Sequence, residues 1–326
     1  MTMQFGLLLP HFGAHTDLDY LLKGSQLAEK LGFDSVWVRD HLLFEPHGEF
    51  EAADRDFLEP LTTLSAVGAV TERLILGTAT LIPYRHPIVT AFTLASMSHM
   101  FGDRIIAGWG AGTFDHEFEA VGMSGIFRPE LVEENARISE LVFNSDNVAF
   151  NGEHFQFKNV TVYPKPVAKI PFWYGGATPA SARRAAEYAD GWIPGRITLK
   201  TIDRRVAKMR EIVAENGRPM PTVGVVPPTT IATTEKEAWA GTSVEGLLKW
   251  ANDRGKWWVK PPSGTFETAE DIEGSLIVGT PEQVIEQTSR FADVGVDHLV
   301  FDLRLSFDRW HESIELLGSE VLPALK

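Results

Sequence analysis

The sequence contains no cysteine among its 326 residues. This absence excludes disulfide bonds, thiolate metal sites and a cysteine nucleophile. The chain also lacks any apolar run approaching the roughly 18 residues that a membrane-spanning helix needs. Its first residues lead directly into an apolar segment, with no basic region and no cleavage site. We therefore expect no signal peptide and a cytoplasmic protein.

The sequence has fewer basic than acidic residues: 30 Lys and Arg residues and 44 Asp and Glu residues give a net charge of −14. Proteins bind nucleic acid through Lys and Arg side chains that neutralise phosphates, so this balance argues against a nucleic-acid partner. An anionic ligand would need a local site built from backbone N–H groups or a few arginines. We expect a small-molecule substrate.

Eight short apolar segments alternate with helical patterns along the chain. They read as strands at Gln4–Leu9, Asp34–Val38, Leu74–Leu81, Arg104–Trp109, Pro171–Tyr174, Gly191–Ile193, Thr222–Val226 and His298–Asp302. Strands joined by helices lie parallel and bring their carboxyl ends to one face. The pattern predicts an α/β fold, a (β/α)8 TIM barrel with insertions that forms a single domain over residues 1–326. A doubly wound open sheet is the alternative, but no Gly-x-Gly-x-x-Gly follows the first strand.

Two stretches depart from the alternating pattern. The first, at about 147–163, is predicted to be a hairpin because Asn151 and Gly152 form a strong turn signal between short strands. The second is a long insertion at about 235–275, which we expect to be irregular. It carries Trp257 and Trp258, which would either cover an apolar ligand or pack the insertion itself.

The predicted helix Ile88–Phe101 is apolar on nearly every side. A helix on the outside of a monomeric barrel should show one polar face. This pattern indicates that another surface covers the helix, and we expect a second copy of the chain.

Glycine and threonine mark a candidate phosphate site at Gly175, Gly176, Ala177 and Thr178. Thr178 is a good N-cap and Pro179 a good first helical residue, while the glycines leave the backbone N–H groups accessible. A helix N-terminus of this kind suits a phosphate, although an ordinary capped helix has the same pattern. The similar start at Gly279–Gln283 contains a capping box, and there we favour the structural interpretation.

Asp40 and His41 directly follow the second predicted strand. A histidine in this position could move protons near neutral pH, but it could also be a loop residue without a task. The residue types of His11, Asp40, His41 and Asp302 would suit a metal ion. No local ligand spacing supports one, however, so we predict no metal site. A serine nucleophile is not indicated, because no Gly-x-Ser-x-Gly occurs.

These segments together resemble the bacterial luciferase-like superfamily, and in particular its F420-dependent oxidoreductase branch. The resemblance is carried in chain order by Phe5–Pro10, Val38–His41, Leu76–Thr80, Gly108–Thr113, Pro171–Pro179, Ala189–Trp192, Leu276–Val284 and Val296–Val300. It implies a (β/α)8 barrel with coenzyme F420 across the carboxyl-end face. It also implies a homodimer that associates through the helices after strands two and three.

The resemblance also implies roles for individual residues. A non-prolyl cis peptide, matched here to Ala79–Thr80, would stand behind the deazaflavin ring. The turn formed by Gly110, Ala111, Gly112 and Thr113 would border that ring, with His116 nearby. The turn from Gly175 to Thr178 would receive the phosphate of the cofactor. His41 would be the proton donor or acceptor, and Asp40 would support it or contact the cofactor.

One position departs from the pattern of the sugar-phosphate dehydrogenases in this superfamily, because Thr113 stands where they carry a glutamate. That proposed proton donor is absent, which puts a sugar-phosphate substrate in doubt. The first hypothesis is an F420-dependent oxidoreductase that moves a hydride between the deazaflavin and a small organic substrate. The alternatives are an FMN-dependent two-component monooxygenase and a catalytically silent protein that binds a flavin or deazaflavin.

Overall fold

The computed structural model describes residues 3–46, 54–240 and 242–326. Within this part of the chain, eight parallel strands close into a barrel in the order β1-β12-β9-β8-β7-β4-β3-β2. The strands are β1 Gln4–Leu8, β2 Ser35–Val38, β3 Ile75–Thr78, β4 Ile105–Trp109, β7 Phe172–Gly175, β8 Gly191–Ile193, β9 Thr222–Val225 and β12 His298–Phe301. The predicted (β/α)8 barrel is therefore confirmed.

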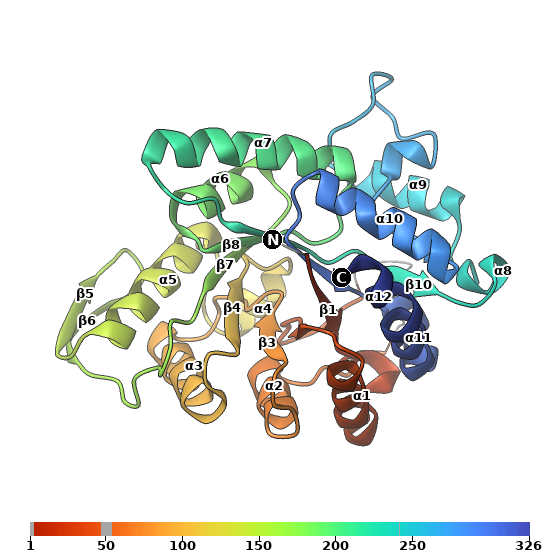
Figure 1. Cartoon of the computed structure of the whole chain (residues 1–326). Helices are drawn as coiled ribbons and strands as arrows, with labels where there is room; N and C mark the ends of the chain where they lie inside the picture. Colours follow the sequence, from red (N-terminus) through yellow and green to blue (C-terminus); the bar gives the residue numbers. More distant parts are fainter. Residues whose placement is uncertain (1–2, 47–53, 241) are drawn as a thin grey trace.

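Helices surround the strands on the outside of the barrel (Figure 1). They are α1 Leu18–Lys30, α2 Pro60–Gly68, α3 Pro87–Phe101, α4 Asp115–Ala120, α5 Arg128–Asn144, α6 Pro179–Tyr188, α7 Leu199–Asn216, α10 Pro281–Asp293, α11 Trp310–Leu316 and α12 Leu322–Leu325. Side chains cap several of them, as predicted. The Thr178 hydroxyl accepts the Ser181 N–H at the start of α6, and Thr280 and Gln283 form the predicted capping box of α10.

Two tryptophans fill the barrel interior. The rings of Trp37 and Trp173 lie 5.2 Å apart between centroids, and both are buried. Glycines on neighbouring strands make room for them, since a Cβ on Gly77 would lie 2.4 Å from Trp37 and one on Gly191 would lie 2.5 Å from Trp173. Large rings opposite glycines thus produce a packed core rather than a pore.

The predicted hairpin is present as β5 Val148–Asn151 paired antiparallel with β6 Gln156–Val160. It lies beside α5 at the edge of the molecule (Figure 1). The buried carboxylate of Glu134 on α5 accepts the backbone N–H groups of Glu153 and Phe155 at 2.6 and 3.0 Å. One helix side chain therefore anchors the hairpin turn.

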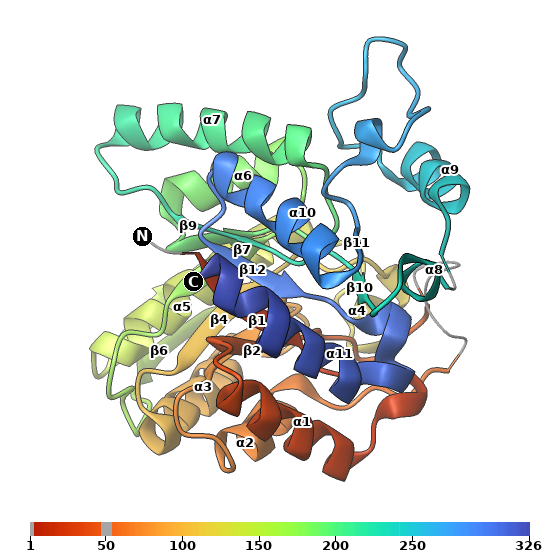
Figure 2. The ribbon, with the colours of Figure 1, turned by 45° about the vertical axis from the view of Figure 1, so that its right-hand side comes forward.

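The expectation of an irregular insertion is wrong. The two-stranded parallel sheet of β10 Thr229–Ile231 and β11 Ile277–Gly279 flanks a segment that contains α8 Glu235–Ala238, α9 Val244–Arg254 and the short helix η2 Glu270–Ile272. Figure 2 shows α8 and α9 standing out from the side of the barrel. The helices were hidden in the sequence because α9 buries just a narrow strip, Leu247 and Ala251.

Helix α3 exposes a row of large apolar side chains. Val89, Phe92 and Met100 are 58%, 49% and 60% exposed, while the opposite side of the helix packs on the barrel and α5. The apolar pattern from which we expected a covering surface therefore includes an exposed apolar face on the outside of α3. Across the described ranges, every helix is too short or too polar to cross a membrane.

Candidate functional site

A cavity of about 280 Å³ opens at the carboxyl ends of the barrel strands. Its floor consists of residues that follow β3, β7 and β8, including Thr80, Gly176 and Pro194. Charged side chains from two further turns also line it: Arg39 after β2, and Asp302 with Arg304 after β12. This is the face on which (β/α)8 enzymes place their active sites, so the cavity is the candidate site.

Thr80 lines this cavity, and the peptide bond between Ala79 and Thr80 is cis, as the resemblance implies. Two glycines on adjacent strand ends accommodate its side chain. A Cβ on Gly110 would lie 2.2 Å from the Thr80 hydroxyl oxygen, and one on Gly175 would lie 2.6 Å from its methyl group. The structure therefore brings Thr80, Gly110 and Gly175 together. A larger residue at either glycine position would collide with the Thr80 side chain.

Asp40 is buried next to the cavity and holds the loop that follows β3. Its carboxylate accepts the Ile82 N–H at 2.8 Å and the Tyr84 hydroxyl at 2.5 Å, and it forms an ion pair with Arg85. Burial, and then the negative charge of Asp40, raises the pKa of Tyr84, so the phenol stays protonated and donates. Asp40 thus fixes the chain immediately beyond Thr80.

The carboxylate beside His41 belongs to Glu117 of α4, not to Asp40. The His41 Nδ1 atom lies 3.2 and 3.3 Å from the two Glu117 oxygens, and Glu117 also accepts the N–H groups of Leu42 and Leu43 at 2.7 and 3.2 Å. Burial alone would raise the pKa of Glu117, but the hydrogen bonds from His41 and this backbone outweigh it, so the pKa is lowered. The expected support of His41 by Asp40 is thereby corrected.

His41 itself is enclosed rather than open to the cavity. Its side chain is 6% exposed, and within the described residues it is not among the groups that line the mouth. The rings of Phe44, Phe57 and Phe114 lie 5.3–5.4 Å from its ring. His41 therefore sits in an aromatic pocket at the carboxyl end of β2.

The turn after β4 divides into a buried and an exposed part. Gly110 is buried, Ala111 and Gly112 are half-buried, and Thr113 is exposed. His116 lies further along, where its Nε2 atom is 3.0 Å from the carbonyl oxygen of Leu43. His116 therefore contacts the turn after β2, which the same α4 helix ties down through Glu117.

The turn after β7 leads from the candidate cavity into a capped helix. Gly176 adopts a φ of 107°, a conformation that favours glycine, and its carbonyl oxygen accepts the Trp192 ring N–H at 3.0 Å. Ala177 and Thr178 follow it half-buried and lead into the ten residues of α6. At the start of this helix the Thr178 hydroxyl accepts the Ser181 N–H at 3.0 Å, so the cap that the sequence predicted is present.

The insertion reaches the mouth through one aromatic residue. Trp250 of α9 lines the cavity, and the Arg196 guanidinium stacks on its ring at 4.6 Å from the centroid. Of the two tryptophans that the sequence singled out, Trp258 is buried and donates to the Arg196 carbonyl at 3.2 Å, whereas Trp257 is 48% exposed. Trp258 packs the insertion, so Trp250, which the sequence analysis missed, is the aromatic residue at the site.

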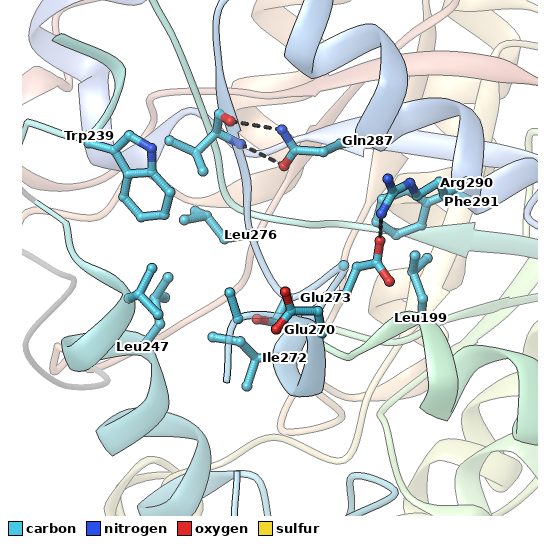
Figure 3. A pocket seen from close by; sticks show the side chains of 15 residues that line it. Leu199, Trp239, Leu247, Glu270, Ile272, Glu273, Leu276, Gln287, Arg290 and Phe291 are labelled. Carbon is cyan, nitrogen blue, oxygen red and sulfur yellow. Dashed lines mark hydrogen bonds and ion pairs between the residues drawn. The ribbon is translucent and has the colours of Figure 1, made fainter. Parts of the chain in front are cut away.

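Other hollows in the molecule are built differently. Figure 3 shows a cavity of about 240 Å³ between the insertion and α10, where Gln287 bonds the backbone of Val278 and Arg290 pairs with Glu273. Its polar groups are thus engaged with one another. A larger cavity, about 770 Å³, lies mainly between α5 and the segment 166–170 and shares no lining residue with the mouth cavity. We therefore keep the mouth cavity as the candidate site.

Four residues have side chains whose type would suit a metal ion: His11, Asp40, His41 and Asp302. His11 is fully buried between the carbonyls of Leu9 and Arg39, and burial lowers its pKa to about 4. Asp302 instead binds Arg304 through both its Nε and backbone N–H groups. In the described part of the chain, no three His, Asp or Glu residues are grouped so that they could hold a metal ion.

Comparison with known proteins now gives this barrel a family. A family model described as luciferase-like monooxygenase matches residues 3–298. The chain belongs to the luciferase-like monooxygenase family. The matched range covers the first seven barrel strands and ends at the first residue of β12, and it agrees with the resemblance noted from the sequence.

Curated relatives of this luciferase-like chain include F420-dependent glucose-6-phosphate dehydrogenases. That of Microbacterium testaceum is 28% identical over 97% of this chain and 94% of the relative, and that of Mycobacterium tuberculosis is 26% identical over 92% and 91%. Among solved structures, an F420-dependent secondary alcohol dehydrogenase aligns with a TM-score of 0.81 at 22% identity over the full length of both chains. The FMN-bound oxygenating constituent of 3,6-diketocamphane monooxygenase from Pseudomonas putida aligns with a TM-score of 0.76 at 19% identity over 99% of both chains. Both structures share the fold.

Proposed function

We propose that this luciferase-like protein is an oxidoreductase that binds coenzyme F420 at the barrel mouth and moves a hydride between it and a small organic substrate. The observation that carries the proposal is the floor of the mouth, where Thr80 sits against Gly110 and Gly175 below an open cavity. The F420-dependent relatives, which align over nearly the whole chain, support the choice of cofactor.

The residues at the mouth fit such a cofactor. Ala79 and Thr80 line the cavity, and the glycine-rich turn from Gly110 to Thr113 follows the adjacent strand β4, with Gly110 against the side chain of Thr80. A phosphate would meet the start of α6 at Gly176, Ala177 and Thr178. When bound, F420 supplies the carbon that accepts or releases the hydride, while the protein positions it and excludes water.

We assign to His41 the proton that accompanies the hydride. The residue stands at the carboxyl end of β2, at the same end of the barrel as the cavity, and it is paired with the buried Glu117. Asp40 acts through the loop that it holds, so it positions the floor at Thr80 and does not exchange protons. Replacing His41 by Asn should lower the rate of hydride transfer by about 10²-fold, the scale of general acid–base catalysis.

The test is to titrate the purified protein with F420 and with FMN and to follow binding by fluorescence. We expect F420 to bind with micromolar or better affinity and to be reduced or oxidised when a panel of alcohols, aldehydes and sugar phosphates is added. Tight binding of FMN with none of F420 would overturn the proposal and favour a two-component monooxygenase. Binding of F420 without turnover on the panel, and without an effect of His41→Asn on cofactor redox, would favour the silent binding protein.

We also propose that the chain forms a homodimer through α2 and α3. The row of Val89, Phe92 and Met100 gives α3 an apolar outer face that a second copy would bury. In sedimentation velocity at micromolar concentration, the wild type should sediment as a dimer and the Phe92→Asp variant as a monomer. Leu18→Asp, at an exposed leucine of α1, is the matched control and should remain a dimer. A monomeric wild type would contradict the proposal.

A further inference from the structure

The cavity of about 770 Å³ beside α5 is separate from the mouth, since the two have no lining residue in common within the described part of the chain. We propose that it is a second ligand site, which takes a neutral aromatic molecule that carries a hydroxyl or carbonyl oxygen. This site is independent of the proposed hydride transfer. Two features point to such a ligand: the size and lining of the cavity, and a buried serine hydroxyl without a partner on its wall.

The walls of the cavity are apolar and in part aromatic. Trp109 of β4 and Phe172 of β7 belong to barrel strands, and Phe143 belongs to α5. Leu94 of α3 and Ile170 add aliphatic surface. Cavities of roughly 300–1,000 Å³ with hydrophobic and aromatic walls are typical of sites that enclose a small organic molecule. The size and lining therefore favour a ligand with an aromatic ring.

One polar group on the wall lacks a partner. Ser139 of α5 lines the cavity and is 7% exposed, and its buried hydroxyl oxygen has no hydrogen-bond partner among the described residues. A buried hydroxyl is destabilising unless it is hydrogen-bonded, so this one points to a group that the cavity would hold. Because a hydroxyl both donates and accepts, its complement is a hydroxyl or carbonyl oxygen of the ligand.

The lining has no excess of charge of one sign among its described residues. It contains the acids Glu133, Glu140 and Asp190 and the bases Arg137, Lys169 and Arg218. Lys169 pairs with Asp190, and Arg137 Nη1 lies 3.9 Å from Glu133 Oε1. Burial raises the pKa of the Tyr188 phenol on the same wall, so this group stays neutral. A charged ligand would have to compete with these pairs or remain without a counterion, and a neutral ligand is therefore favoured.

The cavity reaches the surface at the segment 166–170. Val167 and Lys169 line it, and both are exposed, Val167 by 59% and the Lys169 side chain by 74%. A ligand therefore has a path from solvent to Ser139. The cavity is thus a pocket that exchanges its occupant with solvent, and not a sealed void in the core.

The test measures the binding of 2-naphthol, naphthalene and 2-naphthoate to the full chain by equilibrium dialysis at pH 7. The three probes share one ring system, to which 2-naphthol adds a neutral hydroxyl and 2-naphthoate a negative charge. We expect one 2-naphthol to bind per chain with a dissociation constant of about 100 μM or lower. The charged 2-naphthoate should bind at least about tenfold more weakly.

Ser139→Ala tests the hydroxyl contact. The variant should weaken the binding of 2-naphthol about fivefold and leave that of naphthalene unchanged, because one hydrogen bond to the ligand is lost. Without ligand it should unfold at no lower temperature than the wild type, since the missing hydroxyl had no partner among the described residues. Ser289→Ala is the matched control, because this exposed hydroxyl of α10 donates to the Ile285 carbonyl at 2.8 Å, and it should not alter binding.

Ala136→Trp tests the location. Ala136 lines the cavity three residues before Ser139 on the same helix face, so a large ring there would occupy the space beside the hydroxyl and should abolish the binding of 2-naphthol and naphthalene. Ala214→Trp, at an exposed position of α7, is the matched control and should bind as the wild type does. Trp250→Ala, which changes the lining of the mouth, should also leave binding unchanged.

Three results would overturn the proposal. The first is a wild type that binds no 2-naphthol, including the case in which the Phe92→Asp variant binds it because a second copy had filled the cavity. The second is a loss of binding in Trp250→Ala, which would place the probe in the mouth. The third is an unchanged affinity for 2-naphthol in Ser139→Ala, which would show that water satisfies the hydroxyl.

Discussion

At the scale of single residues, the site depends on two buried carboxylates that have different tasks. Asp40 binds Tyr84, Arg85 and the backbone of Ile82, and so secures the loop after β3. Glu117 binds His41 and the backbone after β2. Asp40 and His41 are therefore neighbours in the sequence but bind different partners, because successive side chains at a strand end point in opposite directions.

A prediction at this scale concerns Asp40→Asn. The change leaves the Arg85 guanidinium, which is 20% exposed, beside a neutral group. Removing one member of a buried ion pair should lower the free energy of unfolding by about 3 kcal/mol, as measured by urea denaturation. Lys23→Gln, which breaks the exposed Lys23–Asp19 pair, is the control and should stay within about 0.5 kcal/mol. Equal effects of the two variants would contradict the assignment of Asp40.

At the scale of elements, the mouth is formed by strand ends that fit one another. Gly110 directly follows β4 and Gly175 ends β7, and both leave room for the side chain of Thr80, which follows β3 and lines the cavity. α9 brings Trp250 to the cavity, and α4 carries Glu117 to the turn after β2. Each element contributes one group, and none of these contacts joins residues close in sequence.

The fit between β3 and β7 gives a prediction with a built-in rescue. In Gly175→Ala, the new Cβ would lie 2.6 Å from the Thr80 methyl group, so overpacking should lower stability by about 2 kcal/mol. Adding Thr80→Ser removes that methyl group and should recover part of the loss in the double variant. Gly195→Ala, whose Cβ meets no atom within 4 Å, should leave thermal unfolding nearly unchanged. A double variant less stable than Gly175→Ala would refute the proposed contact.

At the scale of the whole molecule, two buried histidines make the stability of the fold depend on pH. His11, which follows β1, is buried between the carbonyl oxygens of Leu9 and Arg39, and His298 of β12 bonds the Ser35 hydroxyl at 2.7 Å. Burial lowers the pKa of each from 6.5 to about 4. The unfolded chain therefore binds more protons than the folded one between these values, and the stability present above pH 6.5 is lost as the pH falls towards 4.

This linkage predicts that, as the pH is lowered through that window, the free energy of unfolding decreases by about 1 kcal/mol per pH unit for each histidine. Urea denaturation between pH 7 and pH 4.5 measures the slope. His298→Gln should remove the contribution of one group and flatten the curve, whatever it does to stability at neutral pH. His99→Gln, at an exposed position of α3, should leave the slope as it is. An unchanged slope in His298→Gln would be inconsistent with a buried neutral imidazole.

The barrel and the position of its mouth followed from the sequence, because alternating strands and helices with glycine-rich turns are local patterns. The capping box at Thr280, the hairpin turn at Asn151 and the caps around Thr178 were likewise readable, since each depends on residues within a few positions. The helices of the insertion were missed because α9 is short and has few buried positions.

The sequence by itself determined the fold class and the face that carries the candidate site, because hydrophobic periodicity and turn residues encode them locally. Tertiary structure alone decided which groups meet at that face. Glu117 reaches His41 across 76 positions of chain, and Trp250 reaches the mouth from an insertion that the sequence left without structure. Such contacts depend on how strand ends and loops converge in the closed barrel, which no local pattern records.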